Sequence, residues 1–118
     1  MIGDRDRRQI VRTLLALRQA RCDEFPHELF DEFAWNILLH LFYAHALNEA
    51  VSVATISDRA GTSETAGRRW IEHLVMADQV ESTLAMDDLR MTATAIDAMR
   101  KYVDRVKALG VEQLNDLA

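Results

Sequence analysis

The chain has 118 residues, a common size for a single domain; 49% of them are apolar and 28% are charged, which excludes disordered and fibrous classes of protein. One proline and four glycines are too few for the regular turns of a β-sandwich or barrel, so long helices are expected. The single cysteine, Cys22, excludes an internal disulfide and a cysteine-based zinc cluster, and the net charge of −5 restricts any nucleic-acid surface to a local patch.

The first predicted helix runs from about Asp4 to Arg21 and is amphipathic. Its apolar stripe consists of Ile10, Val11, Leu14, Leu15 and Leu17. Residues 1–21 hold six arginines against two aspartates, whereas residues 22–50 hold six acidic residues and no lysine or arginine. Three interpretations remain open: a dimerisation helix whose charged side faces water, an electrostatic arm that flanks DNA, or a positive segment that pairs with the acidic residues 22–50.

Several signals are absent from the sequence. The first residues contain no apolar signal-peptide core, and no apolar run approaches the length of a membrane span. We therefore expect a cytoplasmic protein without a membrane partner. The sequence also lacks a nucleophile elbow, a phosphate-binding glycine-rich loop and a metal-ligand pattern, so we expect neither enzymatic activity nor a cofactor or metal.

A second helix is predicted from its N-cap, Asp31, to about Leu47. It is apolar nearly all round, with Asn36, His40 and His45 as the polar interruptions. Such a helix belongs in the centre of a domain or of an interface. The two histidines lie five residues apart, which is the wrong spacing for one helical face, so they do not indicate a zinc site.

Residues 52–92 are predicted to form a helix, a tight turn, a second helix and a two-stranded hairpin. Serines cap both helices, and a glycine marks the turn between them. In order, the expected elements are Val53–Ala60 capped by Ser52, the turn at Gly61, Glu64 to about Ala77 capped by Ser63, and strands over Val80–Leu84 and Leu89–Thr92. This is the order of a winged helix-turn-helix.

The residues of this segment fit the helix-turn-helix pattern with two departures. The fitting positions are Ile56, Ser57, Gly61, Ser63, Trp70 and Leu74, with Trp70, Ile71 and Leu74 expected on the inward face of the second helix. Thr62 stands where an aliphatic residue is usual, and Gly67 stands in the helix interior, where glycine costs about 1 kcal/mol relative to alanine. Gly67 therefore requires either a close helix crossing or local flexibility.

The final predicted helix runs from about Thr94 to Leu109. Its apolar residues alternate at spacings of three and four, as in a short coiled-coil seam. The seam consists of Ile96, Met99, Val103 and Val106. A seam this apolar is expected to be covered by a second copy of the chain.

At this point the chain resembles the MarR-like winged-helix regulators over nearly its whole length. The most specific segment is Ser63-Glu-Thr-Ala-Gly-Arg-Arg-Trp-Ile-Glu-His-Leu74, followed by Asp78-Gln-Val80 where the family usually has Gly-Leu-Val. Met91-Thr92 matches the Leu-Thr pair that closes the family's wing, and the stretch from Phe33 to Phe42 looks like the helix before the module.

The resemblance implies a mainly α fold with a small β-hairpin, in which a winged helix-turn-helix is flanked by dimerisation helices. The chain is then one winged-helix domain over residues 1–118, with dimerisation segments at 1–21 and 93–118 around the module at 52–92. It further implies a homodimer that places two recognition helices in successive major grooves of a palindromic site in double-stranded DNA. We expect the dimer interface to contain Ile10, Leu14, Leu17, Ile96, Met99, Val103 and Val106.

Candidate DNA contacts lie on the second helix of the module and on the wing. The outward helix face is expected to carry Glu64, Thr65, Arg68 and Glu72, with Arg69 at its edge, and the candidate DNA-binding residues are Ser63, Thr65, Arg68, Arg69 and Arg90. Arginine reads guanine, and a capping serine meets a phosphate at a helix N-terminus. The alternative is an ordinary solvated helix face. The wing departs from the family because Asp87 and Asp88 repel phosphates.

Two further alternatives stay open. Relatives in the family often bind an aromatic effector, and Asn36, His40 and Tyr43 are the polar residues that would line such a pocket, although core packing is the more economical interpretation of this helix. The protein is expected to regulate transcription through sequence-specific DNA binding. The alternative is a winged-helix protein-interaction module that has lost DNA binding.

Overall fold

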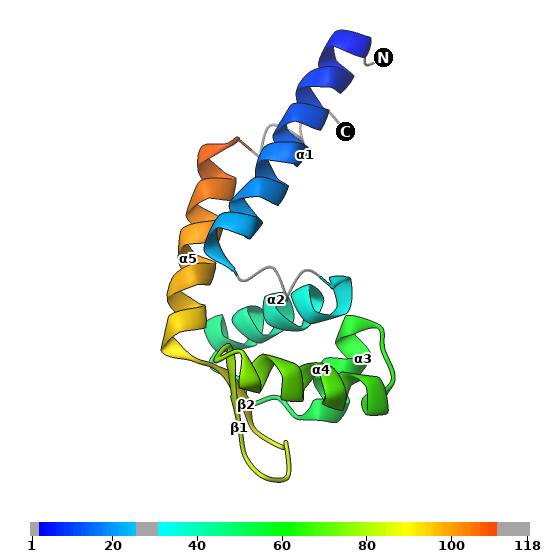
Figure 1. Ribbon diagram of the computed structural model, residues 1–118, viewed down its shortest axis with the longest axis vertical. Helices are drawn as coiled ribbons and strands as arrows, with labels where there is room; N and C mark the ends of the chain where they lie inside the picture. The colour runs from blue at the N-terminus through cyan, green and yellow to red at the C-terminus, as the bar shows by residue number, and fades with distance from the viewer. Residues whose placement is uncertain (1–2, 26–30, 111–118) are drawn as a thin grey trace. The chain divides into compact units, whose positions relative to one another are not determined.

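The computed structural model describes residues 3–25 and 31–110. The chain divides into two compact units, one formed by residues 1–26 with 98–118 and the other by residues 27–97. Figure 1 shows the order of the five helices and two strands that the described residues form. Among the described residues, no helix combines the length and the apolar character needed to cross a membrane.

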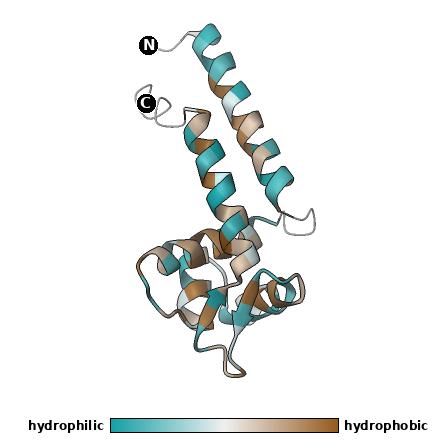
Figure 2. Ribbon diagram, turned by 90° about the vertical axis from the view of Figure 1, so that its left-hand side faces the viewer, coloured by the Kyte–Doolittle hydropathy of each residue, from teal (hydrophilic) through white to brown (hydrophobic). Residues whose placement is uncertain are grey.

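The first unit contains α1 (Asp4–Glu24) and most of α5 (Ala93–Ala108). The two helices lie side by side (Figures 1 and 2). An ion pair joins them, because the Arg105 guanidinium lies 2.9 Å from the Asp23 carboxylate. Hydrogen bonds from Gln19 and Arg105 hold the pKa of Asp23 below its usual value. The pair therefore forms at neutral pH and is lost only as the pH falls through that lowered pKa.

Helix α1 is one turn longer than the predicted helix, which ended at Arg21. The residue after α1 is Phe25, whose φ of −127° and ψ of 149° are extended and whose N–H donates to the Arg21 carbonyl. A residue before proline prefers this extended conformation, and Pro26 follows it in the sequence. The helix therefore ends where the proline forces it to end.

The second unit begins with α2 (Glu32–Ala46), α3 (Val53–Ala60) and α4 (Glu64–Met76), each with the N-cap that the sequence predicts. Asp31 accepts a hydrogen bond from the Phe33 N–H, and Ser52 accepts one from the Thr55 N–H. The three helices pack on one another, and the hairpin packs against α2 and α4. The predicted helix positions are confirmed to within about one residue.

The hairpin consists of β1 (Val80–Ser82) and β2 (Leu89–Met91), paired antiparallel. Both strands are shorter than predicted, because β1 ends at Ser82 and β2 ends at Met91; the residues between Ser82 and Leu89 form the wing loop. The side chain of Thr92 follows β2 and accepts a hydrogen bond from the Ala95 N–H, so α5 begins with a capped turn. The predicted fold class, mainly α with a small hairpin, is confirmed.

The core of the second unit is apolar and draws on every element of the unit. Its fully buried side chains include Ile37, Leu38, Ile56, Ile71, Leu74 and Leu89. Helix α2 is less central than expected, because one of its faces exposes Phe33, Leu39 and Tyr43. It is therefore an amphipathic core helix and not one buried on all sides.

We expect Leu38→Ala to lower the free energy of unfolding by about 2–5 kcal/mol, because Leu38 is fully buried and truncation leaves a cavity. Urea denaturation followed by circular dichroism measures the loss. Tyr43→Ala on the same helix is the control: Tyr43 is 65% exposed, and its truncation should change stability by only about 0.5 kcal/mol. Equal losses for the two variants would contradict this assignment of the core face.

Candidate nucleic-acid interface

Helix α4 is positioned by a tight turn and by a close crossing with α3. Gly61 ends α3 with a φ of 78°, a conformation that favours glycine, and Ser63 caps α4 by accepting a hydrogen bond from the Ala66 N–H at 3.1 Å. A Cβ placed on Gly67 would lie 1.8 Å from the Ser57 Oγ and 2.7 Å from the Ser57 Cβ. Of the two explanations for Gly67, the close helix crossing is therefore the correct one.

The exposed face of α4 differs from the predicted one. The buried residues of the helix are Gly67, Ile71 and Leu74, whereas Trp70, which was expected inward, is only half-buried. The opposite side of the helix carries the exposed residues Thr65, Arg69, Glu72 and Met76, with His73 beside them, so Thr65 and Glu72 face outward as predicted. Arg69 thus lies on the outward face, and the prediction that placed it at the edge is wrong.

The two adjacent arginines of α4 have different surroundings. Arg68 is half-buried and its guanidinium lies 3.7 Å from the Glu64 carboxylate one turn earlier. Arg69 is exposed, and within residues 3–25 and 31–110 no carboxylate forms an ion pair with it. Arg69 is therefore the better placed of the two to meet an anionic ligand.

The residues beside Arg69 form a shallow depression that sequence reasoning did not predict. It is lined by Ala66, Arg69, Trp70 and His73, and the Trp70 and His73 rings meet edge to face with centroids 6.2 Å apart. The sequence contains the signal as a spacing of three between the two aromatic residues, but its apolar pattern predicts Trp70 in the core. The candidate surface is consequently broader than the predicted set of polar residues.

The wing carries an ion pair that makes both of its members less available to other charged groups. Arg90 donates to the two carboxylate oxygens of Asp88 at 3.0 and 3.3 Å, so its charge is largely compensated. Asp87 accepts a hydrogen bond from the Thr83 hydroxyl and returns one from its own N–H. The wing therefore presents one uncompensated carboxylate from this pair of aspartates, and Arg90 is less available to a phosphate than its exposure suggests.

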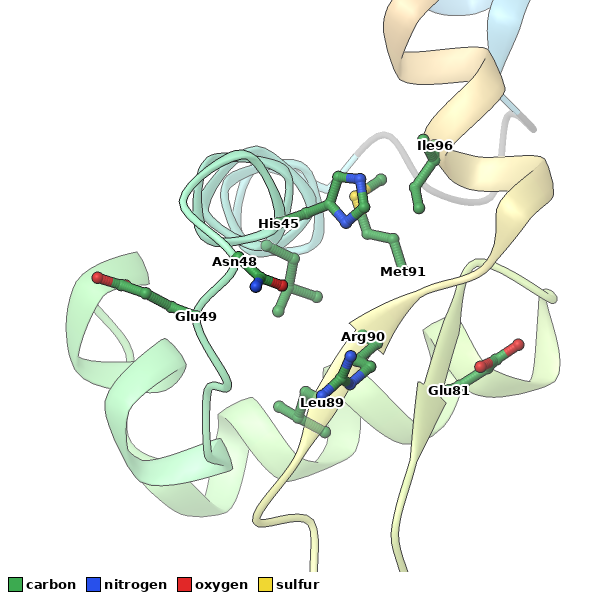
Figure 3. A pocket seen from close by; sticks show the side chains of 9 residues that line it. His45, Asn48, Glu49, Glu81, Leu89, Arg90, Met91 and Ile96 are labelled. Carbon is green, nitrogen blue, oxygen red and sulfur yellow. The ribbon is translucent and has the colours of Figure 1, made fainter.

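A cavity of about 230 Å³ lies between the end of α2, the hairpin and the start of α5 (Figure 3). Apolar side chains including Met91 and Ile96 line it together with His45, Asn48 and Arg90. The residues predicted for an effector pocket lie elsewhere: Asn36 and His40 are half-buried on α2 and Tyr43 is exposed. The cavity is therefore not the predicted effector pocket, which stays a prediction.

The residues predicted for a dimer interface differ in accessibility. Leu14 on α1 and Val103 on α5 are 48% and 43% exposed, respectively, and are available to a partner. The half-buried members of the set are Ile10, Leu17, Ile96 and Val106. Met99 is fully buried within the single chain, so in this conformation it supports the fold and does not reach a surface.

No family model and no curated protein matches the sequence. Among solved structures, the crystal structure of ligand-free NadR, a MarR-like transcriptional regulator, is similar to this chain with a TM-score of 0.63 and 15% sequence identity. The match covers 92% of this chain and 78% of that chain. At this identity the likeness concerns the fold alone: the chain has a winged-helix fold that is distantly similar to that of a MarR-like regulator.

Proposed function

We propose that the protein is a transcriptional regulator that binds a palindromic site in double-stranded DNA as a homodimer. The observation that carries the proposal is Arg69, an exposed arginine without an ion pair among the described residues, on the outward face of α4 in a winged-helix module. In helix-turn-helix proteins the second helix enters the major groove and presents its N-terminal half to the bases. Arg69 lies in that half.

Each candidate residue has a distinct role in this proposal. Arg69 donates two hydrogen bonds to a guanine, and the methyl group of Thr65 contacts a thymine. Ser63 uses its oxygen to cap α4, which leaves its hydroxyl hydrogen for a phosphate at the helix N-terminus. Arg68 and Arg90 contribute less, because Glu64 and Asp88 already compensate their charges.

The acidic composition of the protein determines how much of the DNA binding is specific and how much is non-specific. With a net charge of −5 and a carboxylate on the wing, the protein gains little from non-specific attraction to phosphates. Specific contacts from α4 must then supply most of the discrimination. We therefore expect a clear sequence preference with weak binding to unrelated duplexes.

Selection of bound duplexes from a random DNA pool tests the proposal, and we expect a two-fold symmetric motif. Arg69→Ala should weaken binding to that motif by about 1–3 kcal/mol per half-site and relax the preference at one base pair. Arg68→Ala, the adjacent control, should cost less because Arg68 is already paired with Glu64. Fluorescence anisotropy with the selected duplex measures both losses.

Two outcomes would overturn the proposal. The first is a selection that recovers no shared motif, and the second is an Arg69→Ala variant that binds the motif as tightly as the original protein. In either case the winged-helix interaction module without DNA binding becomes the better account, since the same fold serves both functions.

A further inference from the structure

An exposed apolar surface lies where the C-terminal turn of α4 meets the wing. We name Val75, Met76, Leu84 and Met86 the wing patch. Met76 is 88% exposed and Leu84 is fully exposed, whereas large apolar side chains normally cover one another. Figure 2 shows part of the wing loop in hydrophobic colours.

The wing patch contains a shallow groove. Val75, Met76 and Met86 line it together with Glu72 and Ser82, and its volume is about 360 Å³. The wing side of the groove is held by backbone hydrogen bonds, from the Val53 N–H to the Met86 carbonyl at 2.9 Å and from the Met86 N–H to the Thr83 carbonyl at 3.0 Å. The apolar surface is therefore presented by an anchored loop, and its methionines can adapt to a ligand of irregular shape.

Three carboxylates lie in the patch or next to it in the sequence, and the exposed Arg69 lies one turn of α4 before the first of them, Glu72. Glu72 lines the groove, Asp87 follows Met86, and Asp78 follows α4, and all three are exposed. Arg90 is the only lysine or arginine in residues 70–99, and it is paired with Asp88. The patch is an apolar centre with an acidic margin.

This charge pattern decides which occupant fits. DNA phosphates and anionic lipid headgroups are repelled by the carboxylates. A second copy of the same patch is disfavoured, because a symmetric contact would place carboxylates against carboxylates. A segment with apolar residues on one side and lysine or arginine on the other satisfies both features.

We propose that the wing patch binds a basic amphipathic helix of a partner protein. The apolar face of such a helix fills the groove between α4 and the wing, as in other helix-in-groove complexes, and its cations meet Glu72, Asp78 and Asp87. Arg69 lies seven residues before Met76 on α4, about 10 Å along the helix. Met76 and Arg69 share the outward face of α4, but the inference uses residues other than the proposed DNA contacts and does not rest on them.

The test uses the full chain and three fluorescent 18-residue peptides. The first has leucines at helical spacing and lysines elsewhere, the second replaces the lysines by glutamates, and the third scrambles the first so that the leucines form no stripe. Fluorescence anisotropy should show binding of the first peptide only. In ¹⁵N NMR spectra, that peptide should shift the amide signals of residues 72–76 and 82–87.

Two double variants separate the apolar and the charged contributions. Met76→Ser with Leu84→Ser should weaken binding at least about tenfold, because burying each of these side chains is worth more than 1.4 kcal/mol. Glu72→Lys with Asp87→Lys should weaken it by a similar factor. Asp58→Lys with Asp104→Lys is the control, because it makes the same change in net charge at exposed positions that do not line the groove and should leave the affinity within about threefold.

Three outcomes would overturn the inference. In the first outcome the basic peptide does not bind. In the second it binds the Met76→Ser, Leu84→Ser variant with unchanged affinity, which would show that the peptide is attracted to any acidic protein surface. In the third outcome, that variant changes the oligomeric state of the protein without affecting the peptide, which would assign the patch to a second copy. Arg69→Ala should bind the peptide normally, so failure of the DNA proposal is recognised separately.

Discussion

Gly67→Ala is expected to lower the free energy of unfolding by about 1–2 kcal/mol, although alanine is the better helix former. The added Cβ would lie 1.8 Å from the Ser57 Oγ and 2.7 Å from the Ser57 Cβ, so α3 and α4 must separate. Ser57 is 1% exposed and cannot swing into solvent. Overpacking of this kind typically costs about 1–3 kcal/mol and occasionally more, which outweighs the gain of about 1 kcal/mol in helix propensity.

Variants at Ser57 provide the controls for this prediction. Ser57→Ala alone should be neutral or stabilising, because the buried hydroxyl has no hydrogen-bond partner among the described residues. The swap Ser57→Gly with Gly67→Ala should recover most of the lost stability, since it removes both close contacts and keeps one glycine at the crossing. Urea denaturation measures all three. An unchanged midpoint for Gly67→Ala would show that the helices do not cross as closely as described.

The helices and the turn were predictable because each boundary is encoded locally. Ser52 and Ser63 cap the helices that follow them, and Gly61 supplies the positive φ between α3 and α4. These signals act within three or four residues and depend little on the rest of the fold. The later end of α1 follows from an equally local cause, the restriction that Pro26 places on Phe25.

The orientation of α4 was harder to predict, because the residue at its crossing with α3 has no side chain. Gly67 gives no hydrophobic signal, and the apolar pattern of the sequence places Trp70 inward with Ile71 and Leu74 and puts Arg69 at the edge of the outward face. The crossing is defined by the contact with Ser57, a residue of another helix. Such a contact becomes visible only when the two helices are placed together.

The pairing of charged side chains in the wing was also not predictable from the sequence. The sequence gives Asp87, Asp88 and Arg90 as two acids and one base, but it does not state which of them pair. In the structure Arg90 binds Asp88, while Asp87 bonds to Thr83. Side-chain pairing within a loop depends on its backbone path, so the availability of Arg90 to DNA was not predictable from composition.

Val103→Asp is expected to convert the proposed homodimer into monomers. Val103 is a large apolar side chain that is 43% exposed on α5, and α1 of the same unit exposes Val11, Leu14 and Leu15. In a symmetric dimer each substitution appears twice, and each buried carboxylate without a partner costs several kcal/mol. Since 1.4 kcal/mol corresponds to a factor of ten, the dissociation constant should rise at least about 100-fold.

Light scattering coupled to size-exclusion chromatography, run over a range of micromolar concentrations, measures the change. Ala108→Asp is the matched control, because it adds one carboxylate to the same helix at an exposed position on the side opposite the buried residues Ala95 and Met99. Circular dichroism of the Val103→Asp variant should show native helix content, because the half-exposed side chain leaves room for the carboxylate in the monomer. A wild-type protein that is monomeric at these concentrations, or a Val103→Asp variant that still dimerises, would show that α5 does not form the interface.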